Sequence, residues 1–253
     1  MNQPASFARM LTPISILRYA WWRLRGRGFT VQLQLRNGVR LFVRPRAAGN
    51  NDLGVAYEIF AHQYYACPRP LPADAIRLVV DLGANVGFSC LYWLSSFPQS
   101  GLVAVEPHPT HHAQCRLNLA ANDMLGRVQL HQAAAGAAPG RMTLSDAGTS
   151  STIMQDDADG IPVEMLDVFA LLAGRQVDLM KLDIEGGEYA ILEDPRFAAL
   201  HVPYLVMEWH GGPAERGWCL SRLDALDYET LELFDNGSHG MLWAFRRKPA
   251  LAG

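Results

Sequence analysis

The sequence predicts an α/β protein built on a doubly wound, mostly parallel sheet. Short apolar runs alternate with helical patterns from residue 76 to residue 210. A glycine-spaced turn follows the first of these runs, and an acidic residue ends the next one. Strands joined by helices form parallel sheets that are buried on both faces, which explains continuous β-branched runs.

Length and composition fit a globular chain with an uneven charge distribution. The 253 residues are 49% hydrophobic and 19% charged, enough for one large domain with an appendage. Residues 1–51 contain nine Arg and no Asp or Glu, which leaves 13 basic and 25 acidic residues in the remainder. The four cysteines lack C-x-x-C spacing, so neither zinc nor a redox pair is indicated. We find no signal-peptide pattern and no apolar run long enough to span a membrane, and we expect a cytoplasmic protein.

Residues 1–72 are predicted to form a basic N-terminal extension. Apolar residues at helical spacing are interleaved with arginines over Pro13–Leu24. Asn37-Gly38 favours a type I′ turn, because both central residues need a positive φ, and it lies between two alternating runs. A proline cluster then marks the boundary. The expected elements are a helix over 13–24, a β-hairpin over 30–35 and 39–43, and a short helix over 52–65.

Residues 73–247 are predicted to form the main domain. Its expected strands cover 78–82, 102–106, 128–132, 177–184 and 204–208. Its expected helices cover 87–97, 109–121, 166–172 and 187–192. Asp235-Asn236-Gly237 separates two final strands, 230–234 and 241–245, and predicts an antiparallel hairpin that closes the sheet. Residues 145–160 have the composition of a loop.

The turn after the first strand has the sequence Gly83-Ala84-Asn85-Val86-Gly87. Glycines at such a turn let the backbone bend tightly and approach a ligand, and open α/β sheets bind cofactors at the carboxyl ends of their strands. Asp81 is expected to accept hydrogen bonds from an ammonium group there. Glu106, at the end of the next strand, is expected to hold both ribose hydroxyls. An ammonium-bearing cofactor without phosphate suits this pattern better than a nicotinamide dinucleotide, whose pyrophosphate Asp81 would repel.

A second acidic group lies farther along the chain, in Lys181-Leu182-Asp183-Ile184-Glu185. Alternation along a strand places Lys181, Asp183 and Glu185 on one face. Carboxylates at this edge can orient a hydroxyl, act as a base or hold a divalent cation, for which Asp183 is the candidate ligand. Glu188, in the first turn of the following helix, is expected to complement the helix dipole.

The next strand ends in Glu208-Trp209-His210, so Glu208 and His210 share a face and reach the same edge. A histidine there can accept a hydroxyl proton near neutral pH. A lone histidine is more often structural, and both interpretations stay open. His108, His111 and His112 are expected at the surface or at the rim of the cofactor site.

The runs VVDLGANVGF, AVEPHP, DLMKLDIEGGEYAIL and VMEWH resemble the FkbM family of S-adenosylmethionine-dependent methyltransferases over residues 76–210. The resemblance implies a Rossmann-like class I methyltransferase sheet and O-methylation of sugars, polyketides or other secondary metabolites. It implies that Asp81, Gly83, Ala84, Asn85 and Gly87 line the methionine end of the cofactor and that Glu106 holds the ribose. It places Gln132 and Ala133 by the adenine. It matches Asp183, Glu185 and Glu188 to the acidic block of the family and Glu208 and His210 to its final strand. We predict that Asp183, Glu185, Glu208 and His210 form the catalytic group.

Several alternatives stay open from the sequence alone. Methylation of nitrogen or RNA is one, although no RNA-binding motif is present and we expect no nucleic-acid partner. A nucleotide-binding oxidoreductase is another. The acceptor is expected to be a small molecule or a glycan. The basic segment 1–46 predicts contact with an anionic membrane surface, at the inner face of the membrane. The alternatives are packing on the acidic domain of the same chain or against a second copy of the chain.

Overall fold

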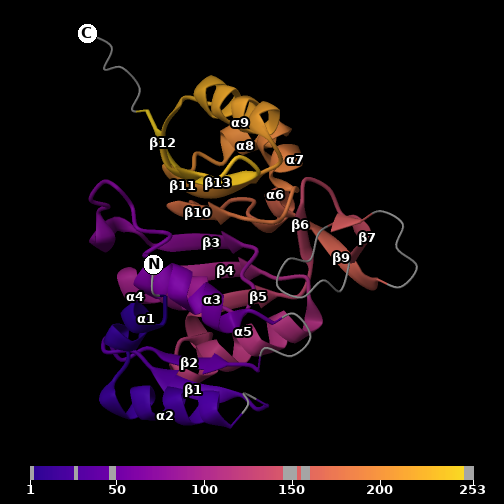
Figure 1. Ribbon diagram of the computed structural model, residues 1–253. Coiled ribbons are helices and arrows are strands. Elements are labelled where there is room, and N and C mark those ends of the chain that lie inside the picture. Colours follow the sequence, from indigo (N-terminus) through magenta and orange to yellow (C-terminus); the bar gives the residue numbers. More distant parts are fainter. Residues whose placement is uncertain (1–2, 26–27, 46–49, 145–152, 155–159, 248–253) are drawn as a thin grey trace.

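The computed structural model has a central seven-stranded sheet with helices on both faces (Figure 1). The structure describes residues 3–25, 28–45, 50–144, 153–154 and 160–247. The strand order is β12-β13-β11-β10-β3-β4-β5, and β13 runs opposite to the other six. The predicted doubly wound sheet, with an antiparallel hairpin at its C-terminal side, is confirmed.

The strands of this sheet agree with the predicted ones to within a few residues. Successive side chains alternate between two hydrophobic clusters: Val79 and Leu179 contribute to one face, whereas Val80 and Met180 contribute to the other. The strands are β3 (Leu78–Leu82), β4 (Gly101–Val105), β5 (Val128–His131), β10 (Leu179–Leu182), β11 (Tyr204–His210), β12 (Tyr228–Asp235) and β13 (His239–Arg246).

Helices cover the two faces in separate groups. One face packs against α4 (Phe88–Ser96), α5 (Pro109–Ala121) and the N-terminal extension. The opposite face packs against α6 (Val168–Leu171), α7 (Glu188–Glu193), α8 (Arg196–Ala199) and α9 (Pro213–Ala225). Of these helices, α8 and α9 were not predicted. Short 3-10 turns, η2 (Ala73–Ala75) and η3 (Leu125–Arg127), precede β3 and β5.

The N-terminal extension contains the predicted helix and hairpin, and the helix has the predicted bounds. The free edge of β2 is not left unpaired. The side-chain amides of Gln114 and Asn118 on α5 and of its C-cap residue Asn122 form hydrogen bonds with the backbone of Arg40 and Phe42 at 2.7–2.8 Å. This pairing attaches the hairpin to the main domain and protects the strand edge. The elements are α1 (Gln3–Met10), α2 (Pro13–Leu24), β1 (Val31–Gln34), β2 (Arg40–Val43), α3 (Asp52–Ala56) and the π-helical turn η1 (Tyr57–Ala61).

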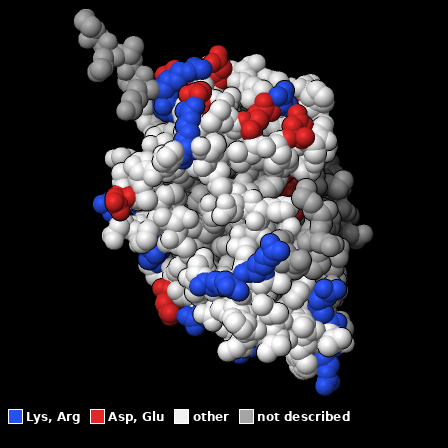
Figure 2. All heavy atoms as spheres, turned by 60° about the vertical axis from the view of Figure 1, so that its left-hand side comes forward, with Lys and Arg blue, Asp and Glu red and all other residues white. Residues whose placement is uncertain are grey.

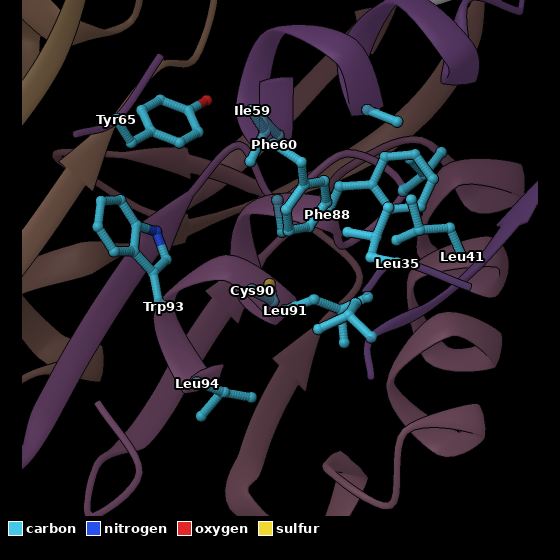
Figure 3. Close-up of a cluster of buried hydrophobic side chains, with 14 of the residues drawn as sticks. Leu35, Leu41, Ile59, Phe60, Tyr65, Phe88, Cys90, Leu91, Trp93 and Leu94 are labelled. Atoms are coloured by element: carbon cyan, nitrogen blue, oxygen red, sulfur yellow. The ribbon is translucent and has the colours of Figure 1, made fainter. Parts of the chain in front are cut away.

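The extension and the main domain share a hydrophobic cluster. Figure 3 shows Leu35, Leu41 and Phe60 of the extension beside Phe88 and Leu91 of α4. The division predicted at residue 72 therefore separates two segments of the chain that are packed around common buried side chains.

A second, smaller sheet beside β5 was not predicted. Its strand order is β6-β9-β7-β8, and it lies to one side of the main sheet in Figure 1. The strands are β6 (Ala134–Gly136), β7 (Gly140–Leu144), β8 (Ile153–Met154) and β9 (Ile161–Asp167). Most of the loop predicted over 145–160 lies outside the described residues. Among the described helices, none has the length and apolar character needed to cross a bilayer.

Candidate active site

A cavity of about 310 Å³ lies at the carboxyl ends of the central strands. Its walls come from the loops after β3, β4 and β10, from the end of β11, from the small sheet and from the extension. Parallel strands present their carboxyl ends at one edge, which explains why residues far apart in the chain meet here. The cavity brings together these predicted site residues: Gly83, Ala84, Asn85, Glu106, Asp183, Glu185 and Glu208.

The two glycines of the turn after β3 are required by the packing of the protein itself. Both have a positive φ, 86° at Gly83 and 84° at Gly87. A Cβ on Gly83 would lie 1.8 Å from the carbonyl oxygen of Asp183, and one on Gly87 would lie 2.7 Å from Cys115 Sγ on α5. The expectation that these glycines also make room for a ligand stays a prediction. Gly83 lines the cavity, but Gly87 does not, and it allows α5 to approach the turn.

Asn85 supplies an unsatisfied acceptor at the cavity. Its φ of 49° is in the left-handed region, and its backbone N–H donates to Glu106 Oε2 at 2.8 Å. Its side-chain Oδ1 is buried and has no hydrogen-bond partner within the described part of the chain. Buried polar atoms are nearly always satisfied, so this oxygen is suited to a donor on a bound molecule, such as an ammonium group.

Asp81 lies below the cavity and does not line it. Its Oδ1 is 3.3 Å from Lys181 Nζ, and Lys181 also lies 3.3 Å from Asp183 Oδ2 and donates to the carbonyl of Gly83 at 2.8 Å. Burial lowers the pKa of Lys181, but the nearby charges of Asp183, Tyr65 and Asp81 outweigh it and raise that pKa well above its usual value. Asp81 thus binds an ammonium group of the chain itself, where a cofactor ammonium was expected.

Glu106 lies where a ribose carboxylate was predicted. One carboxyl oxygen accepts the N–H of Asn85, and the other accepts the N–H of His108 at 2.9 Å. Burial raises the pKa of Glu106 to about 7, against the lowering effect of these two hydrogen bonds. Each carboxylate oxygen has a second lone pair, so the group can still accept hydrogen bonds from hydroxyls in the cavity.

The residues after β5 that line the cavity are not the predicted pair but the next two residues of the chain. Ala134 and Ala135 line it, whereas Gln132 is exposed and Ala133 is buried outside the lining. The assignment of Gln132 and Ala133 to the adenine stays a prediction, and the structure offers the next two alanines as wall residues.

Glu188 organises the loop between β10 and α7. Its fully buried side chain accepts the N–H of Ile184 at 2.7 Å and of Gly186 at 2.8 Å. The loop contains two positive φ values, 56° at Glu185 and 105° at Gly186. The role of Glu188 is therefore more specific than the expected interaction with the helix dipole: it fixes the backbone that carries Glu185.

His210 lies behind the cavity wall and is surrounded by carboxylates. Its Nε2 is 3.3 Å from Glu185 and 3.8 Å from Glu208, and its Nδ1 is 3.4 Å from Glu188. Burial lowers the pKa of His210, but the hydrogen bond and charge of Glu188 and the charges of Glu185 and Asp183 raise it to about 9. Burial and the charge of Asp183 raise the pKa of Glu208 to about 8. His210 thus lies next to the carboxylates of the predicted acidic group.

The extension supplies one wall of the cavity that was not predicted. Glu58, Tyr64 and Tyr65 line the cavity from η1 and the segment after it. The Tyr65 hydroxyl lies 3.4 Å from Asp183 Oδ2, and burial followed by the charge of Asp183 raises the pKa of Glu58. The pair Tyr64-Tyr65, just before the proline cluster, is the only feature of the sequence that could have pointed to this wall. No sequence pattern indicated that these tyrosines lie beside Asp183, more than a hundred residues farther along the chain.

Three further cavity residues come from segments that carried no assigned motif: His239 on β13, and Met142 and Leu144 on β7. The expectation of surface or rim histidines at the start of α5 is wrong for His108, which is buried. Its ring stacks on that of His111 at 4.4 Å. His111 is also buried, yet it lines the cavity, with its Nδ1 3.7 Å from Glu106.

The sheet order, the glycine turn and the acidic residue after β4 define a class I S-adenosylmethionine-dependent methyltransferase. The family model described as "Methyltransferase FkbM domain" matches residues 81–245, so the chain belongs to this family. The resemblance seen in the sequence is thereby confirmed, and the oxidoreductase alternative is set aside.

Two curated relatives are also methyltransferases. Methyltransferase 1 of Beauveria bassiana is 24% identical over 188 residues, which cover 64% of this chain and 74% of the relative. Methyltransferase sdnD of Sordaria araneosa is 25% identical over 173 residues, which cover 54% of this chain and 66% of the relative.

Solved structures similar to this chain include a methyltransferase from Geobacter sulfurreducens, with a TM-score of 0.43 and 17% identity over 68% of this chain and 71% of that one. A SAM-dependent O-methyltransferase from Thermotoga maritima has a TM-score of 0.45 and 10% identity over 87% of this chain and 79% of that one.

Proposed function

We propose that this enzyme methylates a hydroxyl group on a sugar, a glycan or a secondary metabolite. The observation that carries the proposal is the group formed by Asp183, Glu208 and His210, whose oxygen and nitrogen atoms lie within 4.8 Å of one another. Asp183 and Glu208 line the same cavity as the turn after β3 and Glu106. A neutral alcohol is a poor nucleophile, so its methylation benefits from a base at this position.

The order of strands at the cavity edge supports a division into a cofactor half and an acceptor half. Glu106 follows β4, the glycine turn follows β3, Asp183 follows β10, and Glu208 lies in β11. Neighbouring strands are about 4.8 Å apart, so three spacings place Glu208 about 14 Å from Glu106. S-adenosylmethionine, when bound, supplies a methyl group on a positively charged sulfur. In this arrangement Glu106 holds the ribose hydroxyls, Asn85 Oδ1 accepts from the ammonium group, and Asp183 faces the acceptor.

Glu208 is the strongest candidate for the base. Its pKa of about 8 is close to neutral, which suits a group that takes up and returns a proton. His210 has a pKa of about 9, so at neutral pH it is protonated, and both of its nitrogens lie within 3.3–3.8 Å of carboxylate oxygens. We therefore assign His210 to orienting Glu185 and Glu208.

The acceptor half is rich in carboxylates, which favours a neutral or cationic acceptor. Glu58, Asp183, Glu185 and Glu208 line this part of the cavity together with Tyr64 and Tyr65. Carboxylates accept hydrogen bonds from hydroxyl and ammonium groups, and tyrosine rings offer apolar area with a polar tip. A phosphate or carboxylate on the acceptor would meet like charges. A polyhydroxylated acceptor, with or without an amine, fits best.

The alternative is that Asp183 binds a divalent cation at this edge of the sheet. The contacts support it less well, because Asp183 Oδ2 already lies 3.3 Å from Lys181 Nζ and 3.4 Å from the Tyr65 hydroxyl. A protonated His210 has no free lone pair for a metal. We therefore expect full activity in EDTA, and a loss of activity that added Mg²⁺ or Mn²⁺ restores would establish the cation.

The test is a mass-spectrometric screen of sugars, glycans and hydroxylated metabolites for the gain of one methyl group. Asp183→Asn should abolish this gain while the affinity for S-adenosylhomocysteine stays nearly unchanged. Asp224→Asn is the matched control and should be silent, since Asp224 on α9 is an exposed partner of Arg247 and does not line the cavity. Methyl transfer to nitrogen or RNA, with no hydroxyl accepted, would contradict the proposal.

A further inference from the structure

Helix α2 has an exposed apolar face that nothing in the described chain covers. The exposed fractions are 65% for Ile14, 71% for Leu17, 50% for Trp21 and 86% for Leu24. These residues are spaced three or four apart and so lie along one side of the helix. Phe29, 39% exposed, continues this side, and its ring lies 5.3 Å from that of Trp21. Monomeric proteins rarely expose a contiguous apolar surface of this kind without a use for it.

The opposite side of α2 already holds the helix on the protein. Trp22 and Ser15 are buried, the Trp22 ring nitrogen donates to the carbonyl of Phe29 at 2.7 Å, and Ser15 Oγ accepts the N–H of Gln34 on β1 at 2.7 Å. The exposed side therefore cannot be explained as the packing side of a loosely attached helix. Helix α2 lies at the end of the molecule opposite β12 (Figure 1), and its apolar side is exposed to solvent.

Arginines without acidic partners border this apolar side. Arg18 and Arg25 follow Leu17 and Leu24 directly, and both are exposed. No ion pair joins Arg18, Arg23 or Arg25 to an acidic group of the described chain, although Arg25 stacks over Trp21 at 5.5 Å. Figure 2 shows the uneven distribution: arginines and acidic residues are mixed near the top of the molecule, and blue side chains predominate over its lower part.

From this combination we infer that α2 binds to an anionic lipid bilayer, with Leu17, Trp21 and Leu24 among the lipid chains and Arg18 and Arg25 at the phosphates. Helices with one apolar and one basic side lie in the plane of the bilayer interface, and tryptophan is enriched at that depth. The inference is independent of the methyl acceptor. It places the enzyme at the inner membrane face, where acceptors attached to lipids are within reach.

Two other partners fit the same surface less well. In a symmetric dimer built on α2, the arginines of the two copies would face each other across one patch, and residues 1–51 contain no acidic residue to neutralise them. A nucleic acid would pair with the arginines but leave four large apolar side chains in water. A bilayer offers phosphate and hydrocarbon side by side.

The test is flotation of the full chain with phosphatidylcholine vesicles, with and without phosphatidylglycerol. We expect flotation at low salt only when phosphatidylglycerol is present, and its loss at high salt. Each arginine near the surface contributes about fivefold in partitioning, so Arg18→Glu with Arg25→Glu should weaken binding by at least about 25-fold. Leu17→Glu with Trp21→Glu should abolish it.

Two controls match these changes on other surfaces: Leu233→Glu on β12 and Arg175→Glu, both at exposed positions, should float like the unmodified chain. A thermal shift with S-adenosylhomocysteine checks that every variant is folded. The inference is overturned if the chain does not float with anionic vesicles at low salt, or if the α2 variants float normally. It is also overturned if light scattering shows a dimer that the Leu17→Glu and Trp21→Glu changes dissociate, while flotation is absent.

Discussion

Replacing Glu188 by glutamine tests whether this buried side chain positions the acidic edge of the site. Its two carboxyl oxygens accept the N–H groups of Ile184 and Gly186, and one of them lies 3.4 Å from His210 Nδ1. A glutamine has the same shape but only one carbonyl oxygen. In Glu188→Gln one backbone N–H must therefore face an NH₂ group and lose its acceptor.

The expected loss of stability follows from this one backbone N–H without an acceptor. An unsatisfied buried N–H costs roughly 1–3 kcal/mol. For a chain of this length each kcal/mol lowers Tm by about 2–4 °C, so calorimetry should find a decrease of about 2–12 °C. Glu193→Gln, at an exposed position of the same helix, should leave Tm unchanged.

The same change removes the charge that contributes most to the pKa of His210. That pKa is about 9 with Glu188 in place, and we expect it to fall in the variant, because burial continues to lower it while the charges of Glu185 and Asp183 still raise it. An NMR titration of the imidazole resonances in EDTA-treated protein measures this directly. If His210 still titrates near 9, or if Tm is unaffected, the role assigned to Glu188 is refuted.

Two further predictions concern the cofactor half and the dependence of stability on pH. Glu106→Ala should weaken S-adenosylhomocysteine binding by about 10–100-fold, since hydrogen bonds to charged groups contribute roughly 1.5–3 kcal/mol; unchanged affinity by calorimetry would rule out the ribose assignment. The cofactor-free protein should lose stability as the pH rises from about 6.5 to 9, because Glu106, Glu208 and His210 have folded-state pKa values of about 7, 8 and 9, all above their unfolded values. The folded state then binds more protons than the unfolded state, and stability falls with pH. A Tm that stays constant or rises over this range would contradict these pKa values.

The parts of the fold and of the site that have a local sequence pattern could be predicted from the sequence. The strand 78–82, the turn that follows it and Glu106 could be placed because apolar runs and glycine spacing are local signals. The small sheet could not, because β6 and β8 contain three and two residues, too few for any periodicity. Asp81 shows a different limit: its position was predicted correctly, but its partner Lys181 is a hundred residues away, and only the packing of β3 against β10 brings the two together.

The division between the parts of the cavity has a consequence for how the enzyme chooses its acceptor. The family match begins at residue 81, so Glu58, Tyr64 and Tyr65 lie outside it although they line the cavity. In the proposed division, the cofactor half lies within the matched residues 81–245, whereas one wall of the acceptor half comes from the extension. The extension also carries α2, so the wall that we propose to contact the acceptor and the surface that we propose to contact the membrane belong to one packed unit.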